Sequence, residues 1–333
     1  MVEPTGGSEV ENCLEHAGGE NDHPATRAWY RLRSEAPPPT AVETLKSKGH
    51  SSVYRLHGVG PAGAPIIAKR SHRTTVMVER VVYEEILPTL PLPALHCYGG
   101  VEEEDGAGAW LFLEDAGGRP YLEERAGDRV LAAEWLGVMH AATSRLDLAA
   151  RFPPVELDSY LGYLRLTRAH VEDHLARGGL HRQRRSVFER IIGHLDGLER
   201  RWRSVDALWS RMPRCLVHRD FISANVRVRG DAGGSTLYVM DWGRAGWGVP
   251  AKDIAGLDVD TYWCRVRGCW SEFGRATIQT MAALGDVLRY LDWMEATSQY
   301  LASPLSSWVE DSEGDLVLYE GLLARARVTA GLV

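Results

Sequence analysis

The sequence predicts an α+β fold with two lobes, a small lobe with a five-stranded antiparallel sheet plus one helix and a larger, mainly helical lobe. Short apolar–polar alternations bounded by glycine or proline dominate the chain up to residue 115, as is typical of short strands. Long helical patterns dominate the remainder, and a glycine-containing linker at 116–118 separates the two regions. The 333 residues are enough for two units that each bury a core.

The N-terminal region divides into an extension and the small lobe. Residues 1–24 are rich in Gly, Glu and Asn and predict a flexible extension. Residues 25–115 form the predicted small lobe, in which the helix over 74–87 has apolar residues at helical spacing and stops at a proline. The other elements expected in this lobe are a short helix over 25–34 and strands over 41–45, 52–56, 65–70, 95–98 and 109–113.

The predicted large lobe covers residues 116–333 and begins with long amphipathic helices. Their patterns run over 128–146, 158–176 and 183–212. Brief strand-like segments follow at 215–217, 226–229 and 237–240, and the rest of the lobe is again mostly helical. Polar residues cluster at the ends of these short strands, so we expect the functional groups there.

Composition limits the classes of function. The net charge of −7 argues against nucleic acid as a partner, and no window approaches 18 uninterrupted apolar residues, which argues against a membrane span. The acidic N-terminus lacks the apolar region of a signal peptide, and the five cysteines form no Cys-x-x-Cys pair. We therefore expect a cytoplasmic protein, monomer or homodimer, that binds neither nucleic acid nor membrane.

The segment that follows the third long helix carries the most informative motif. A strand ends at His218-Arg219-Asp220, and Asn225 follows the aspartate by five positions and opens the next strand. Sixteen residues later comes Asp241, in Met-Asp-Trp-Gly. Phosphoryl transfer needs such a set: an aspartate that orients and deprotonates the attacking hydroxyl, and oxygen ligands for Mg²⁺. The alternative is that Asp220 and Asn225 only cap turns.

This motif resembles the aminoglycoside phosphotransferase and choline kinase-like superfamily, whose pattern is His-Gly-Asp-x4-Asn followed by an Ile-Asp-Trp/Phe-Glu type of metal motif. The resemblance covers roughly residues 40–260 and implies a protein-kinase-like fold with the catalytic loop and acceptor pocket in the helical lobe. Arg219 departs from the pattern, because the family usually has glycine there. The further matching segments are Glu79–Tyr83, Leu111–Ala116, Leu136–Ala141 and Ala251–Ala255, where Asp253 is usually structural.

One lysine is the candidate phosphate ligand of the small lobe. Only four of the 38 basic residues are lysines, and Lys69 lies near the end of the third predicted strand, where its ammonium can neutralise the α- and β-phosphates. Glu79 shares the inward face of the following helix, so we expect it to hold Lys69 in an ion pair. Glu84 and Glu85 are the alternatives on the same helix.

The first predicted hairpin is the expected phosphate-covering loop. Gly49 provides the turn, although a glycine here can also be turn chemistry alone, and Ser51 and Ser52 can offer hydroxyl or backbone N–H groups. By resemblance, the backbone of Glu114 and Ala116 would hydrogen-bond a purine edge. The expected cofactors are therefore Mg²⁺ and ATP or GTP, which the side chains do not distinguish.

The acceptor pocket has two sets of candidate residues. Aromatic residues after the metal motif can stack on an acceptor or form the core of the helical lobe. They are Trp242, Trp247, Tyr262, Trp263 and Trp270. Acidic residues can hold a polycationic acceptor or form a solvated face. They are Asp258, Asp260, Glu272, Asp286, Asp292 and Glu295.

We interpret the chain as a small-molecule O-phosphotransferase that moves a γ-phosphoryl group to an acceptor hydroxyl, with Asp220, His218 and Arg219 as catalytic residues. The leading hypothesis for the acceptor is an aminoglycoside or nucleoside antibiotic, which the enzyme would inactivate. The alternative is a metabolic kinase for choline, an amino-alcohol or a sugar. A protein kinase is disfavoured, because it would need an Ala-Pro-Glu motif and a long activation segment, which this sequence lacks. A pseudokinase that only binds ligand is disfavoured, because it would need a broken site, whereas the residues of this site are all present.

Overall fold

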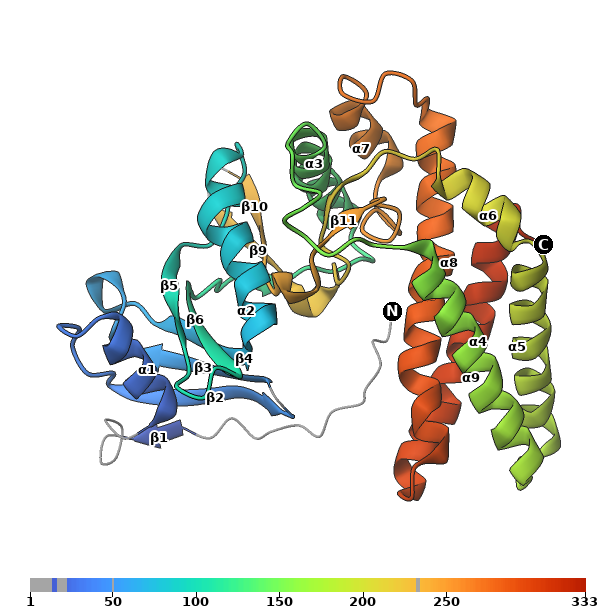
Figure 1. The fold of residues 1–333 in the computed structure, drawn as a ribbon, viewed down its shortest axis with the longest axis horizontal. Coiled ribbons are helices and arrows are strands. Elements are labelled where there is room, and N and C mark those ends of the chain that lie inside the picture. The colour runs from blue at the N-terminus through green and yellow to red at the C-terminus, as the bar shows by residue number, and fades with distance from the viewer. Residues whose placement is uncertain (1–13, 17–22, 50, 232–233) are drawn as a thin grey trace. The chain divides into compact units, whose positions relative to one another are not determined.

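The computed structural model describes residues 14–16, 23–49, 51–231 and 234–333, and most of the predicted extension, residues 1–24, lies outside this part (Figure 1). The chain divides into two compact units. The sheet unit contains, among the described residues, 14–122 and 220–245, and the helical unit contains Glu123–Arg219 and Gly246–Val333. Our predicted boundary after residue 115 placed residues 220–245 in the helical lobe, whereas their contacts in the structure join them to the sheet unit.

A six-stranded antiparallel sheet is the framework of the sheet unit, in the order β1-β2-β3-β4-β6-β5 (Figure 1). Five of its strands are the predicted ones, so the fold class is confirmed. The sixth, β1, pairs with β2 from within the region that we expected to be a flexible extension. The strands are β1 (Leu14–His16), β2 (Ala41–Lys48), β3 (Ser51–His57), β4 (Ile66–His72), β5 (Cys97–Glu102) and β6 (Gly108–Glu114).

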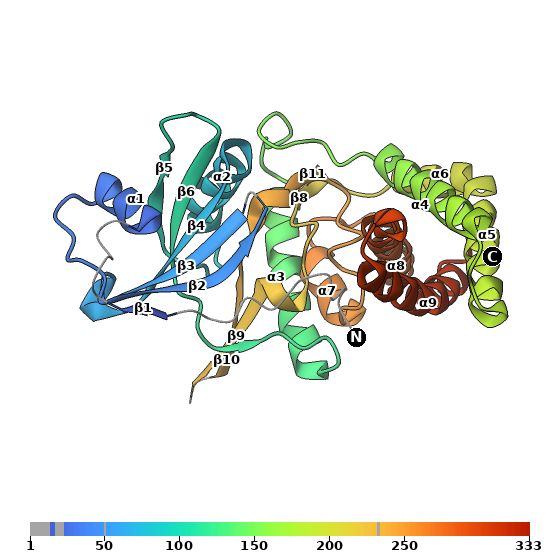
Figure 2. The same ribbon diagram turned by 90° about the horizontal axis from the view of Figure 1, so that it is seen from below.

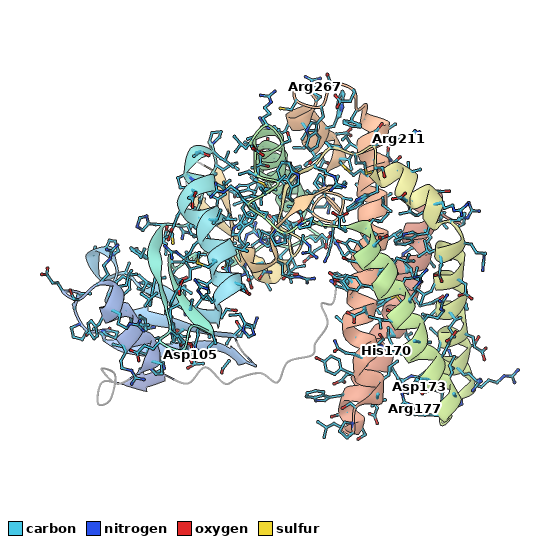
Figure 3. The ribbon with its side chains drawn as sticks, viewed as in Figure 1. Asp105, His170, Asp173, Arg177, Arg211 and Arg267 are labelled. Atoms are coloured by element: carbon cyan, nitrogen blue, oxygen red, sulfur yellow. The ribbon has the colours of Figure 1, made fainter. Side chains whose placement is uncertain are left out.

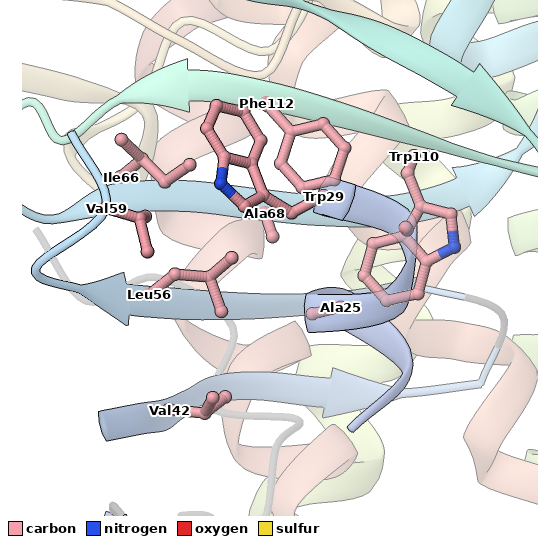
Figure 4. Close-up of a cluster of buried hydrophobic side chains, with 10 residues drawn as sticks. Ala25, Trp29, Val42, Leu56, Val59, Ile66, Ala68, Trp110 and Phe112 are labelled. Carbon is pink, nitrogen blue, oxygen red and sulfur yellow. The ribbon is translucent and has the colours of Figure 1, made fainter. Parts of the chain in front are cut away.

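One face of this sheet is covered by α1 (Pro24–Leu32). The helix begins with a proline at its first position, and His23 caps it by accepting from the Ala25 N–H at 3.1 Å. Trp29 packs against Phe112 with ring centroids 5.1 Å apart, above the buried Leu56 of β3 (Figure 4). Removal of these apolar side chains from water holds the helix on the sheet.

The helix α2 (Arg73–Arg80) carries a glutamate into the interior of the sheet unit. Its buried residues, Val76 and Glu79, are three positions apart and share one face. The chain continues as a π-helical segment, Val81–Ile86, and a final turn, Leu87–Thr89, so the predicted helix over 74–87 exists but changes its winding.

A second, three-stranded sheet joins β7 (Arg119–Pro120), β9 (Val226–Asp231) and β10 (Gly234–Val239).

The helical unit is built around α8 (Arg275–Ser298), which packs on α4 (Leu157–Arg177), α7 (Val259–Val266) and α9 (Ser306–Thr329) (Figure 2). The predicted helix over 183–212 is two helices, because the backbone leaves helical geometry at Arg201. A two-stranded sheet pairs β8 (Cys215–Val217) with β11 (Gly246–Gly248). The helices are α3 (Ala126–Thr143), α4 (Leu157–Arg177), α5 (Arg182–Arg200), α6 (Trp202–Trp209), α7 (Val259–Val266), α8 (Arg275–Ser298) and α9 (Ser306–Thr329). Within the described part of the chain, no helix is long and apolar enough to cross a membrane.

Candidate active site

A buried lysine joins three segments of the sheet unit. Lys69 lies on β4, opposite Val53 of β3 and Leu111 of β6. Its ammonium donates to Glu79 Oε1 on α2 and to Asp241 Oδ1 after β10, both at 2.6 Å. Burial by itself lowers the pKa of Lys69, but the negative charges of Glu79 and Asp241 outweigh this effect and hold the pKa above its ordinary value.

Glu79 is the partner chosen by helix geometry, and it is completely buried. Burial raises the pKa of Glu79 to about 7, even though the Lys69 ammonium lowers it. Its second oxygen, Oε2, has no hydrogen-bond partner among the described residues. The two alternatives lie elsewhere: Glu84 pairs with Arg80 at 2.9 Å, and Glu85 is exposed.

The aspartate and asparagine of the central motif meet on one turn. The Asn225 amide Nδ2 donates to the carboxylate of Asp220 at 3.0 Å and to its backbone carbonyl at 2.9 Å. The backbone carbonyl of Asn225 accepts from the Met240 N–H at 2.9 Å, which places Asp241 next to this turn. The Asp220 side chain keeps 27% of its surface exposed and has the Arg244 guanidinium 3.8 Å away. Asp220 is therefore both positioned and accessible.

Asp241 occupies a strained backbone conformation beside Lys69. Its φ of +63° lies in the left-handed region, which costs a residue with a side chain on the order of 1–2 kcal/mol. Gly243 allows the close approach of this loop to α2, because a Cβ there would lie 2.4 Å from Thr75 Cγ2. The loop is thus pressed against the helix that carries Glu79.

The arrangement of Asn225 and Asp241 fits a hard cation. Both amide hydrogens of Asn225 are directed to Asp220, so its carbonyl oxygen Oδ1 is the atom left for a ligand. The Asp241 side chain is 37% exposed and adds an anionic oxygen. One neutral and one anionic oxygen suit Mg²⁺, which retains water and phosphate oxygens in its other positions.

A buried carboxylate holds the backbone just before Asp220. Within the helical unit, Asp253 accepts from the His218 N–H at 2.6 Å and from the Arg219 N–H at 2.7 Å. His140 Nε2 lies 3.4 Å from the same carboxylate, and its Nδ1 is 2.8 Å from the Tyr262 hydroxyl. Burial by itself raises the pKa of Asp253, but His140 and His218 outweigh it and hold the pKa below its ordinary value. This supports the structural role expected for Asp253.

The Asp253 carboxylate also holds Arg219 in a conformation that favours glycine. Its φ is +69°, and among the described residues only Ala62 and Asp241 share a positive φ without being glycine. A glycine adopts this conformation at no steric cost, whereas an L-residue loses on the order of 1–2 kcal/mol. The arginine therefore keeps its place at an energetic disadvantage.

The segment 114–116, whose backbone we expected to bind a purine, is fixed by an arginine. Arg229 on β9 donates to the backbone carbonyls of Asp115 and Ala116, and to the Glu114 carboxylate at 2.7 Å. The Ala116 carbonyl is thus already engaged, and its N–H group is the one that could meet a base. Arg229 was missed by our reasoning from sequence, because an arginine on a strand carries no local sign of this role.

The predicted covering loop lies between β2 and β3, and its residue 50 is outside the described part of the chain. Gly49 follows β2 with a φ of +56°, and among the described residues no atom beyond its chain neighbours lies within 4 Å of the Cβ that a substitution would add. Ser51 and Ser52 begin β3, and Ser52 pairs with Arg70 of β4, one residue from Lys69. The structure thus places both serines on β3, the strand next to the one that carries Lys69.

The aromatic residues behave mainly as core. Trp242, Tyr262 and Trp270 are buried, with the Trp270 indole N–H donating to Ser144 Oγ at 3.1 Å. Trp247 and Trp263 are half-buried, and the guanidinium carbon of Arg267 lies over the Trp263 ring, 5.3 Å from its centroid. These positions leave only the last two as candidates for stacking on an acceptor.

The acidic residues have several different environments. Asp258 caps α7, and Asp260 forms an exposed ion pair with Arg275. Asp292 is buried and pairs with Lys252, whereas burial raises the pKa of Asp286. Glu272 is exposed and Glu295 is half-buried. They do not form a single acidic surface.

A strand lysine held by a helix glutamate, with an Asp-x4-Asn turn and a further aspartate beside it, is the arrangement of phosphoryl-transferring enzymes. The model of the phosphotransferase enzyme family matches residues 47–284, and the chain belongs to this family. It is therefore an enzyme, a phosphotransferase of the small-molecule kinase type. No curated protein matches the chain significantly.

Solved structures show the same fold at low sequence identity. The GDP complex of an aminoglycoside 2'-phosphotransferase-IIIa mutant has a TM-score of 0.62 at 13% identity, covering 89% of this chain and 96% of that one. For choline kinase from Cryptosporidium parvum the values are 0.58 and 11%, with 88% and 91% covered. For Plasmodium vivax ethanolamine kinase they are 0.54 and 13%, with 88% and 84% covered.

Removing the charge of the buried Asp253 carboxylate should destabilise the fold. We expect Asp253→Asn to lower the free energy of unfolding at pH 7 by about 3 kcal/mol, because the amide leaves backbone N–H groups poorly paired. Since the folded-state pKa of Asp253 lies below the ordinary 3.8, the stabilisation is present above that pH and is lost as the pH falls through the lowered pKa.

Urea denaturation over a pH series measures this difference, with the exposed Asp260→Asn as the matched control. An Asp253→Asn protein as stable as the wild type at pH 7 would contradict the role given to Asp253. So would a difference in the free energy of unfolding that persists unchanged in strong acid.

Proposed function

We propose that the enzyme transfers the γ-phosphoryl group of a Mg²⁺-nucleoside triphosphate to a hydroxyl of a small molecule. The observation that supports this most strongly is the continuous network Glu79–Lys69–Asp241, with Asp220 and Asn225 on the neighbouring turn. Structural ion pairs alone do not require an accessible aspartate beside such a network. Phosphoryl transfer does, because the attacking hydroxyl must reach a base.

Each residue of the network has a distinct role in this proposal. Asp220 orients the acceptor hydroxyl and accepts its proton, and Lys69, held by Glu79, neutralises phosphate charge. Asn225 and Asp241 hold Mg²⁺, which when bound withdraws charge from the phosphate oxygens. Lys69 donates to Asp241 in the structure, so the same carboxylate serves both the ammonium and the cation site.

The remaining predicted residues support this centre. His218 and Arg219 carry the backbone that leads to Asp220, and Asp253 fixes both of their N–H groups. In the proposal the Gly49 turn with Ser51 and Ser52 covers the phosphates. The backbone of Glu114 and Ala116 meets the purine of ATP or GTP, and Arg229 fixes this segment through the Glu114 carboxylate and the Ala116 backbone carbonyl.

For the acceptor, we favour an antibiotic of the aminoglycoside or nucleoside type, modified in the cytoplasm. This is supported by the fold shared with a phosphotransferase solved with GDP and kanamycin, at a TM-score of 0.60 and 13% identity. The likeness to choline and ethanolamine kinases supports a metabolic alternative. A nucleotide-consumption screen over both acceptor classes, with ATP and GTP in separate series, distinguishes them.

The proposed base gives the most direct prediction. Asp220→Asn should lower kcat by roughly 10²–10⁴-fold with little change in nucleotide affinity, because proton transfer and hydroxyl orientation act in the transition state. Steady-state kinetics and nucleotide titration measure the two quantities separately. Near-wild-type kcat in this variant would overturn the assignment of Asp220.

The Lys69 pair predicts a different pattern. Lys69→Ala should raise the nucleotide KM and lower kcat together, and Glu79→Gln should do the same more mildly, by about tenfold in kcat/KM, or about 1.4 kcal/mol. Glu84→Gln is the matched control, because Glu84 lies on the same helix and pairs at the surface. A damaging Glu84 variant beside a silent Glu79 variant would refute this part of the site.

The cation site predicts dependence on Mg²⁺ or Mn²⁺. Asp241→Ala should be inactive at any practical metal concentration, whereas Asn225→Ala should be weaker in effect, since water can replace a neutral ligand. Asp105→Ala, an exposed carboxylate of the same unit, is the control (Figure 3). Titration of activity against free Mg²⁺ tests this, and full activity in excess chelator would rule the site out.

A further inference from the structure

Arg229 on β9 holds the segment that we propose meets the purine, residues 114–116, and all of these groups belong to the sheet unit. Its guanidinium donates to three acceptors, the Glu114 carboxylate and the backbone carbonyls of Asp115 and Ala116. The guanidinium carbon also lies over the Tyr238 ring of β10, 4.1 Å from its centroid, in a cation–π contact. The donors that face this segment are therefore held in a fixed arrangement.

The Ala116 carbonyl is engaged at β9. Arg229 Nε donates to this carbonyl, and the chain stays close to β9 over the next two residues. A Cβ on Gly118 would lie only 2.6 Å from the Val228 carbonyl oxygen, so a glycine is needed at this close approach. The bond from the charged guanidinium to the Ala116 carbonyl is stronger than a bond from a neutral donor, because it is charge-assisted.

The side chain of Asp115 fixes the same segment from β3. It accepts from Arg55 Nε on that strand at 2.6 Å and from the Gly117 N–H at 3.0 Å. Ala116 itself is buried, and no described residue accepts from its N–H group. At Ala116 the segment therefore offers a base one hydrogen-bond donor, whereas the carbonyl of the same residue is engaged by Arg229.

Adenine and guanine differ at the ring nitrogen N1. In adenine N1 is an acceptor, which matches the Ala116 N–H group, whereas in guanine it carries a hydrogen and is a donor. Guanine could instead place its O6 on this N–H group, but its N1–H group would then need an acceptor beside it. The Ala116 carbonyl is the neighbouring acceptor, and Arg229 competes for it. A site that leaves a donor of the base unpaired in this way discriminates against that base.

We propose that Arg229 is a positioning residue that makes the enzyme select an adenine over a guanine nucleotide as its phosphoryl donor. It acts by holding the Ala116 carbonyl at β9, so that Ala116 presents a donor to the base and no acceptor beside it. Hypoxanthine is disfavoured for the same reason, because it shares the N1–H group of guanine. This inference rests on the phosphotransferase function proposed above and narrows the donor from ATP or GTP to ATP.

Binding of nucleoside diphosphates tests the inference without requiring an acceptor or turnover. The probes are ADP, GDP, inosine diphosphate and purine riboside diphosphate, titrated with Mg²⁺ into the full-length protein by calorimetry. Purine riboside keeps the N1 acceptor of adenine but lacks its amino group. We expect ADP and purine riboside diphosphate to bind about tenfold or more tightly than GDP and inosine diphosphate, because only the latter two carry the N1–H group.

Three results would overturn the proposal. They are equal affinity for all four nucleotides, tighter binding of GDP than of ADP, and purine riboside diphosphate that binds as weakly as inosine diphosphate. The last result would mean that the amino group of adenine, and not the N1 position, decides the preference.

Variants assign the preference to the side chain. Arg229→Gln should reduce the ratio of ADP to GDP affinity to about threefold or less, because the Ala116 carbonyl becomes available to the N1–H group. A merely structural role would weaken ADP and GDP alike and leave their ratio unchanged. Arg229→Lys should keep part of the preference, since one ammonium cannot serve all three acceptors.

The matched control is Arg31→Gln, because Arg31 also donates to a backbone carbonyl of the sheet unit, that of Glu102 at 2.9 Å. Thermal melting shows whether each variant is folded at the assay temperature. A folded Arg229→Gln protein that keeps the full wild-type ratio would contradict the proposal. If Arg229→Gln does not fold, an unchanged ratio in Arg229→Lys would contradict it.

The two proposals fail in different ways. If the base preference is absent while the wild type transfers phosphoryl groups and Asp220→Asn does not, only the role of Arg229 is wrong. If the preference is present while Asp220→Asn transfers phosphoryl groups as well as the wild type, the assignment of Asp220 fails and the role of Arg229 stands. If none of the four nucleotides binds, the proposed function is wrong and this inference fails with it.

Discussion

The buried Lys69 ammonium, shared between two carboxylates, is the interaction on which the rest of the site depends. It joins a strand, a helix and the loop after β10, and the partner Asp241 is 172 positions away in the chain. Removing an ammonium from water is costly unless opposite charges and hydrogen bonds compensate it, so the three segments are stable only when they meet. This one set of contacts therefore fixes both the ammonium that we propose binds phosphate and a candidate metal ligand.

Local sequence patterns were sufficient for the elements and for part of the site. Apolar–polar alternation predicted five strands of the sheet. Helical spacing placed Glu79 on the inward face of its helix, which identified it over Glu84 as the partner of Lys69. The five-residue spacing of Asp220 and Asn225 singled out this turn as a candidate site, and the structure shows that the two side chains are hydrogen-bonded there. These features depend on residues that are close in sequence, which is why periodicity and spacing reveal them.

Interactions between distant residues could not be predicted in this way. Nothing near Lys69 indicates that Asp241 shares its ammonium, and nothing near Arg229 indicates that it holds the carbonyls of the 115–116 linker. The pairing of β1 with β2 is equally non-local, because strand partners are selected by the assembled sheet. Side-chain burial decides such cases: Trp242 and Trp270 belong to cores that only the folded chain defines.

The proposed reaction moves a γ-phosphoryl group from a nucleotide to an acceptor hydroxyl. The most direct measurement uses ATP or GTP labelled with ¹⁸O throughout the γ-phosphoryl group, incubated with acceptors and Mg²⁺ and analysed by mass spectrometry. We expect an acceptor phosphate with three labelled oxygens and an unlabelled bridging oxygen, because the acceptor hydroxyl attacks phosphorus. Labelled inorganic phosphate alone, with no labelled acceptor across the panel, would contradict it.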